Sequence, residues 1–75
     1  MNKTSFLENL KLQFEEEEMS NILFDTKFKD IDTWDSLTKF SIIAFVEDDY
    51  NVKITDFSKI ETVSQLYEFV LLNNK

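Results

Sequence analysis

The segment Trp34-Asp35-Ser36-Leu37 contains the side chain with the clearest chemical use in this 75-residue chain. Ser36 is predicted at the first position of a strongly apolar helix, directly after a long connection, with its hydroxyl facing solvent. The first turn of a helix offers backbone N–H groups and the positive end of the helix dipole. A phosphate group joined to this hydroxyl is therefore electrostatically favoured. Taken alone, the same four residues also fit an ordinary helix start in which Asp35 is the N-cap.

Other chemistry is hard to build from this composition. The chain has no histidine, cysteine or glycine, so the usual general base, thiol nucleophile and glycine-rich phosphate loop are missing. The acidic residues Asp30, Asp32 and Asp35 lack the glycine and the distant glutamate of a calcium-binding EF-hand loop. A pair of catalytic carboxylates needs a cleft that a chain this short is not expected to form. We therefore expect no metal site and no catalytic activity.

The chain is strongly acidic, with fifteen Asp and Glu residues against eight Lys and Arg residues and a formal charge of −7. Nucleic acid is a poor partner for such a surface, whereas a basic protein surface is a good one. No apolar run resembles a signal peptide or is long enough to cross a bilayer. We therefore expect a cytoplasmic protein, with no nucleic-acid partner and no membrane insertion.

Hydrophobic periodicity predicts an all-α fold, a small bundle of three main helices and one short helix. The first helix is expected to begin near Ser5, since Ser5 and Glu8 have capping-box spacing. It is expected to stop near the acidic run 15–18, because negative charge is unfavourable at a helix C-terminus. That run is interpreted either as a solvated helix end or as a docking site for a basic partner. A long loop over 20–34, rich in apolar residues, is expected to pack against the bundle.

The second main helix is expected from Ser36 to Tyr50, with Asn51 as its stop. Apolar residues cover more than half of its circumference, which predicts a central position in the fold. These residues are Phe40, Ile42, Ile43, Phe45, Val46 and Tyr50. A short helix over 56–60, capped by Thr55 or Asp56, is expected next. The last helix should follow Thr62, which has capping-box spacing to Gln65.

Asp35-Ser36-Leu37 at the start of a central helix resembles the acyl carrier protein family, in which this serine bears 4′-phosphopantetheine. The resemblance covers nearly the whole chain, 1–75, as a single domain of that kind. Glu47-Asp48-Asp49-Tyr50 is similar to the acidic end of the family's second helix. Other matching positions lie in the family's long loop and before its last helix: Phe28, Ile31, Ile54, Ile60, Thr62 and Val63. Trp34 and Ser41 depart from many fatty-acid carriers and resemble a Trp-Asp-Ser-Leu subgroup found in specialised biosynthetic pathways.

The resemblance implies a monomeric, non-catalytic carrier that holds acyl or aminoacyl groups as thioesters on an arm at Ser36. Asp35 and Leu37 would be the flanking motif. The partners would be a phosphopantetheinyl transferase and the enzymes that load and accept the cargo. Trp34 is interpreted either as a loop anchor under the second helix or as a partner contact beside the arm. The acidic segment Glu47, Asp48 and Asp49 is interpreted either as a solvated face or as a docking site for basic partners.

Two alternatives to this function remain open at the level of sequence. The first is the same chemistry in general fatty-acid synthesis, against which Trp34 and Ser41 argue. The second is an unmodified acidic helical module that only binds a partner protein. For a carrier, the bulky rings of Phe40, Phe45 and Phe57 predict cargo that is short or polar, because close-packed interiors leave little room for a long chain. Ala44 is a small residue that would return part of that space.

Overall fold

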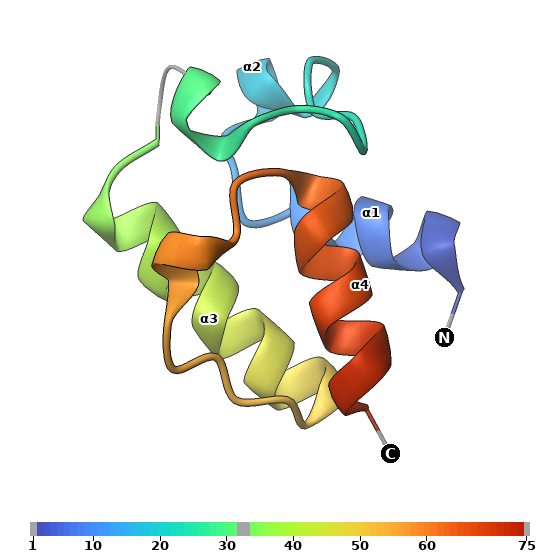
Figure 1. Ribbon diagram of the computed structural model, residues 1–75. Helices are drawn as coiled ribbons and strands as arrows, with labels where there is room; N and C mark the ends of the chain where they lie inside the picture. The colour runs from blue at the N-terminus through green and yellow to red at the C-terminus, as the bar shows by residue number, and fades with distance from the viewer. Residues whose placement is uncertain (1, 32–33, 75) are drawn as a thin grey trace.

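The computed structural model describes residues 2–31 and 34–74, and within these ranges the chain is all-α (Figure 1). Its longer helices are α1 (Lys3–Lys11), α3 (Ser36–Tyr50) and α4 (Val63–Asn73). A four-residue helix, α2 (Glu16–Met19), and two 3-10 turns, η1 (Phe28–Asp30) and η2 (Phe57–Lys59), lie in the connections. The predicted fold class is therefore confirmed. Asp32, one of the three acidic residues considered for calcium, lies outside the described residues.

Helix α1 begins and ends earlier than the sequence predicted. Its N-cap is Asn2, whose side-chain oxygen accepts a hydrogen bond from the Ser5 backbone N–H at 3.1 Å. The predicted start near Ser5 is wrong because asparagine is as good an N-cap as serine. The helix ends at Lys11, so Phe14 is buried from the turn that follows it. The acidic run does not extend α1; its last three residues begin the separate helix α2, at whose N-terminus negative charge is favourable.

Helix α3 has the predicted bounds and caps. The Asp35 carboxylate accepts the Thr38 backbone N–H at 2.9 Å, and Asn51 ends the helix in the left-handed conformation with φ of 57°. Ile42, Phe45 and Val46 are buried, as expected for a central helix.

Phe40 contradicts the expected buried position in the apolar arc of α3, because the residue is 62% exposed. Ala44 is exposed as well, so neither residue changes the space inside the bundle. Neighbouring elements cover only part of the helix circumference, and Phe40 lies on the uncovered part. Ile43 and Tyr50 are half-buried at the edge of the core.

The core joins the three longer helices through aromatic contacts. Phe6 of α1 is fully buried, and its ring centroid lies 6.0 Å from that of Phe45 and 5.4 Å from that of Tyr50, both on α3. The ring of Tyr67 on α4 is also 5.4 Å away from Phe6, in an edge-on arrangement. Large rings supply much buried area per residue, which suits a chain with few residues to bury.

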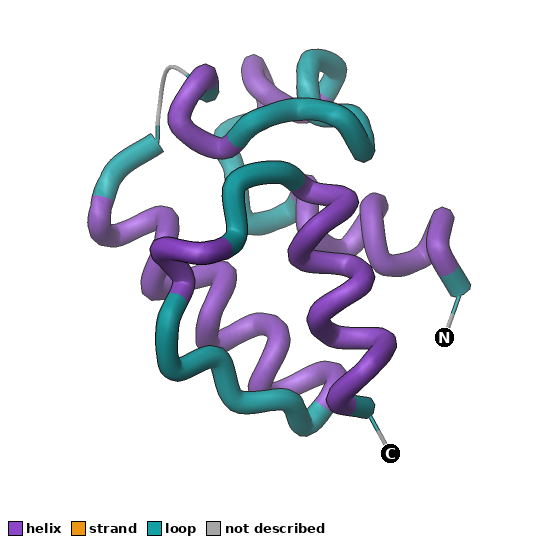
Figure 2. The backbone as a smooth tube through the Cα atoms, in the orientation of Figure 1, coloured by secondary structure: helices purple, strands orange, loops and turns teal. Residues whose placement is uncertain are grey.

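The connection between α1 and α3 packs on the bundle, as predicted from its apolar residues. Ile22, Phe28 and Ile31 are buried, whereas Leu23 is exposed. Backbone hydrogen bonds join this connection to the start of α4: Phe28 N–H to Glu61 O at 2.9 Å, Val63 N–H to Thr26 O at 3.1 Å and Ser64 N–H to Phe24 O at 2.8 Å. In Figure 2 the connection crosses above the start of α4. These bonds place η1 opposite η2.

The predicted caps of the last two elements are confirmed. Asp56 caps η2 by accepting the Ser58 backbone N–H, and Thr62 caps α4. Both bonds of the Thr62–Gln65 capping box are present, with the Gln65 N–H to Thr62 Oγ1 distance at 3.1 Å. Among the described residues, no helix combines the length and apolar character needed to cross a membrane.

Candidate functional site

Ser36 is the first residue of α3, and its side chain is exposed, as the sequence predicted. The residue before it is the N-cap, and the residue after it, Leu37, is 77% exposed. Because Ser36 is in the first turn of α3, its backbone is held in the helical conformation, while its side chain is exposed. The hydroxyl is therefore presented at a defined position that another protein can approach.

Asp35 holds the start of α3 with two hydrogen bonds to one residue. Its carboxylate accepts the Thr38 backbone N–H at 2.9 Å and the Thr38 hydroxyl at 3.0 Å. These bonds, the backbone one first, lower the pKa of Asp35 from its ordinary value of 3.8, so the group is ionised at neutral pH. The Thr38 N–H, one of the first-turn N–H groups, is therefore already bonded to Asp35, and a phosphate on Ser36 would lie beside a carboxylate.

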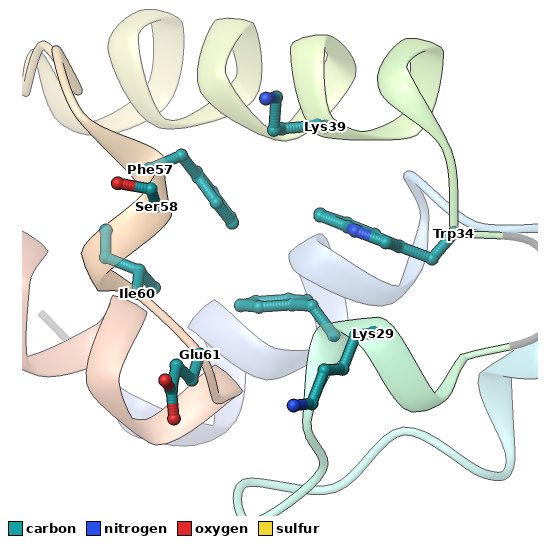
Figure 3. Close-up of a pocket in the computed structure, with 8 residues that line it drawn as sticks. Lys29, Trp34, Lys39, Phe57, Ser58, Ile60 and Glu61 are labelled. Atoms are coloured by element: carbon teal, nitrogen blue, oxygen red, sulfur yellow. The ribbon is translucent and has the colours of Figure 1, made fainter.

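A cavity of about 310 Å³ opens beside the first turn of α3 (Figure 3). Its residues come from η1, from the entry to α3, from α3 itself and from the segment that contains η2. They are Phe28, Lys29, Trp34, Lys39, Phe57, Ser58, Ile60 and Glu61. Figure 3 shows the rings of Trp34 and Phe57 facing the space, with Lys39 along α3 and Lys29 and Glu61 at the opposite edge. Trp34 and Lys39 flank Ser36 in the chain, so the cavity lies beside the candidate attachment residue.

Trp34 is half-buried in an aromatic cluster, consistent with the interpretation as a loop anchor. Its ring stacks on Phe28 with 5.0 Å between centroids and on Phe14 with 6.4 Å. Its centroid is also 5.7 Å from that of Phe57 in η2. The ring therefore joins the loop, the entry to α3 and η2, while part of it faces the cavity. A contact with a partner protein remains a prediction.

The acidic segment Glu47, Asp48 and Asp49 is exposed in the last turns of α3. It begins eleven residues after Ser36, which corresponds to about 16 Å along the helix axis. The structure therefore does not bring the acidic segment and Ser36 together. It places them at opposite ends of one helix, where a partner would have to span most of α3 to contact both.

The cavity and its two lysines were not predicted from the sequence. For Lys39 the available signal was its spacing of three residues from Ser36, since residues i and i+3 share a helix face. No spacing in the sequence predicts that Lys29 and Glu61 lie near Ser36 or near each other. They come together because backbone hydrogen bonds pair the first connection with the start of α4.

Comparison with protein-family models, with curated proteins and with solved structures finds no match to this chain. Within the described residues, no group of three or more acidic, histidine or cysteine side chains is arranged to hold a metal ion. The features that bear on the function are therefore Ser36, its surroundings and the resemblance of its motif.

Proposed function

We propose that this chain is a carrier protein that bears 4′-phosphopantetheine on Ser36 and transports acyl or aminoacyl groups as thioesters. The observation that carries the proposal is the exposed Ser36 hydroxyl at the first position of α3, beside an N-cap that Asp35 supplies. In acyl carrier proteins, which this chain resembles, the serine of the Asp-Ser-Leu triplet also stands at the start of a central helix. A specialised biosynthetic pathway, as in the Trp-Asp-Ser-Leu subgroup, is the setting that Trp34 and Ser41 favour.

The attachment would be a phosphoryl-group transfer from coenzyme A, performed by a separate transferase that uses magnesium. The Ser36 Oγ forms a bond to the phosphorus that carries the pantetheine, and the diphosphate bond of coenzyme A breaks. Adenosine 3′,5′-bisphosphate leaves, and the hydroxyl proton passes to a base of the transferase or to water. The carboxylate of Asp35 is bonded to Thr38, so its role in this chain is to cap the helix.

The chain's own residues provide the position and the surroundings of the arm. When bound, 4′-phosphopantetheine supplies the thiol on which cargo is held, and the chain has no cysteine of its own. Lys39, one helical turn from Ser36, offers positive charge on the same side of α3 as the attachment point.

Charge on the surface is what suits the chain to repeated, brief docking. The exposed acidic segment at the end of α3 and the net charge of −7 attract enzymes that have basic docking surfaces. Electrostatic attraction speeds encounter without requiring a large apolar interface. A carrier needs such docking because it must leave each enzyme after handing over its cargo.

Mass spectrometry of the intact protein tests the proposal. The chain is produced together with a broad-range phosphopantetheinyl transferase, and in parallel without it. The proposal predicts one phosphopantetheine adduct per chain, present only with the transferase. An unmodified mass in both preparations would contradict it and favour the unmodified binding module.

A further inference from the structure

We infer that the cavity beside Ser36 receives short acyl cargo that ends in a carboxylate, held between Lys29 and Lys39. This inference rests on the proposed function, because it names the class of cargo that the arm would carry. The cavity volume of about 310 Å³ lies at the lower end of the range for small-molecule sites, about 300–1,000 Å³. A long acyl chain is therefore disfavoured.

The walls of the cavity are apolar and its edges are charged. Phe28, Trp34 and Phe57 form an aromatic wall, with ring centroids 5.0 to 5.7 Å apart. Lys39 lies at one edge, and Lys29 lies at the opposite edge with Glu61 (Figure 3). The charged lining residues therefore sum to one positive charge, in a chain whose total is −7.

This local charge favours an anion in spite of the acidic surface elsewhere. Ions screen exposed charges beyond about 8 Å at physiological salt, so cargo inside the cavity responds chiefly to Lys29, Lys39 and Glu61 at its edges. A short methylene chain can pack on the rings while a terminal carboxylate meets either lysine. A long chain without a charge gains no ion pair with the lysines.

The cavity is open to solvent, so binding of a free anion should be weak. A tether on Ser36 changes this, since short flexible linkers give effective concentrations in the millimolar range. Weak recognition at this cavity is therefore sufficient to hold tethered cargo while leaving it available for release. Exposed ion pairs contribute modestly, and each lysine is expected to change the affinity by a factor of about 1.5 to 5.

The test compares succinyl and butyryl groups, which have the same carbon chain and differ in the terminal carboxylate. Each is loaded on the arm, and the indole N–H resonance of Trp34 is followed by NMR, with the chain that lacks the arm as reference and the chain with the unloaded arm measured beside it. The succinyl group should shift this resonance, and the Lys29→Gln, Lys39→Gln double variant should lose most of the shift. Lys53→Gln, an exposed lysine outside the cavity, is the matched control and should keep it.

Three results would overturn the inference: equal shifts for both cargoes, equal loss in the Lys53→Gln control, or a full shift already present with the unloaded arm. The last result would assign the lysines to the phosphate of the arm. The unmodified chain is titrated separately with the succinyl and butyryl thioesters of N-acetylcysteamine at millimolar concentration. The succinyl thioester should bind more tightly, by about 2- to 25-fold if both lysines contribute. This titration does not need the arm, so failure of the cavity and failure of attachment at Ser36 are distinguishable.

Discussion

The two phenylalanines Phe57 and Phe40 allow a sharp test of the structure, because the same substitution should have very different effects at each. Phe57 is 8% exposed, and its ring lies 5.3 Å from that of Phe28 and 5.7 Å from that of Trp34. Phe40 is 62% exposed on α3. Replacing a buried phenylalanine by alanine costs about 3–5 kcal/mol. We expect about 3 kcal/mol for Phe57→Ala, because water can enter the open cavity and offset part of the loss.

Phe40→Ala removes the same atoms from an exposed position and should change the free energy of unfolding by less than about 0.5 kcal/mol. A domain of this length is expected to have a total stability of roughly 4–11 kcal/mol. The Phe57→Ala variant should therefore still fold, with a much smaller free energy of unfolding.

Urea denaturation followed by far-ultraviolet circular dichroism measures both effects. Tryptophan fluorescence is unsuitable, because Trp34 contacts Phe57 directly. With a slope of about 1 kcal/mol per molar urea, the midpoint should fall by about 3 M for Phe57→Ala and by less than about 0.5 M for Phe40→Ala. Equal losses, or a larger loss for Phe40→Ala, would show that the two rings are misplaced and that the cavity wall is wrong.

Three further predictions concern stability and charge. Thr62→Ala removes the N-cap of α4 and should lower the free energy of unfolding by about 1 kcal/mol, measured by urea denaturation, with no loss if the capping box is unimportant. The melting temperature should rise with salt and with magnesium at about millimolar concentration, because screening relieves the repulsion within a chain of charge −7; a flat or falling melting temperature would contradict this. The capping bonds lower the pKa of Asp35, so its contribution to stability should be present above pH 3.8 and lost as pH falls through the lowered pKa. A phosphate on Ser36 should raise that pKa again, and NMR titration of Asp35 with and without the arm measures the change; an unchanged or lower pKa would place the phosphate away from the carboxylate.

Local signals in the sequence predicted the elements that position Ser36. Asp35 and Asn51 gave the ends of α3, and Thr62 and Gln65 gave the start of α4, because caps depend on hydrogen bonds between residues three or four apart. The start of α1 was mispredicted because two good capping residues, Asn2 and Ser5, lie within three positions of each other. The spacing of residues alone does not determine which of two neighbouring capping residues begins the helix.

The surroundings of Ser36 depended on contacts that no local rule describes. Periodicity predicted that apolar residues cover more than half of the circumference of α3, but only packing determined that Phe40 faces solvent while Phe45 is buried. The cavity arises where η1 meets η2, through backbone hydrogen bonds between segments more than thirty residues apart. Lys29 and Glu61 therefore could not be assigned to a common site from their positions in the chain.

The most direct test of the carrier proposal is to map the phosphopantetheine adduct with two matched variants on α3. Ser36→Ala removes the proposed attachment point, and the helix should persist because Asp35 remains as its N-cap. Ser41→Ala removes another exposed serine of the same helix. After production with the transferase, intact-mass spectra should show the adduct on the Ser41→Ala chain and none on the Ser36→Ala chain, with both chains equally helical. An adduct that persists on a folded Ser36→Ala chain would contradict the assignment of Ser36.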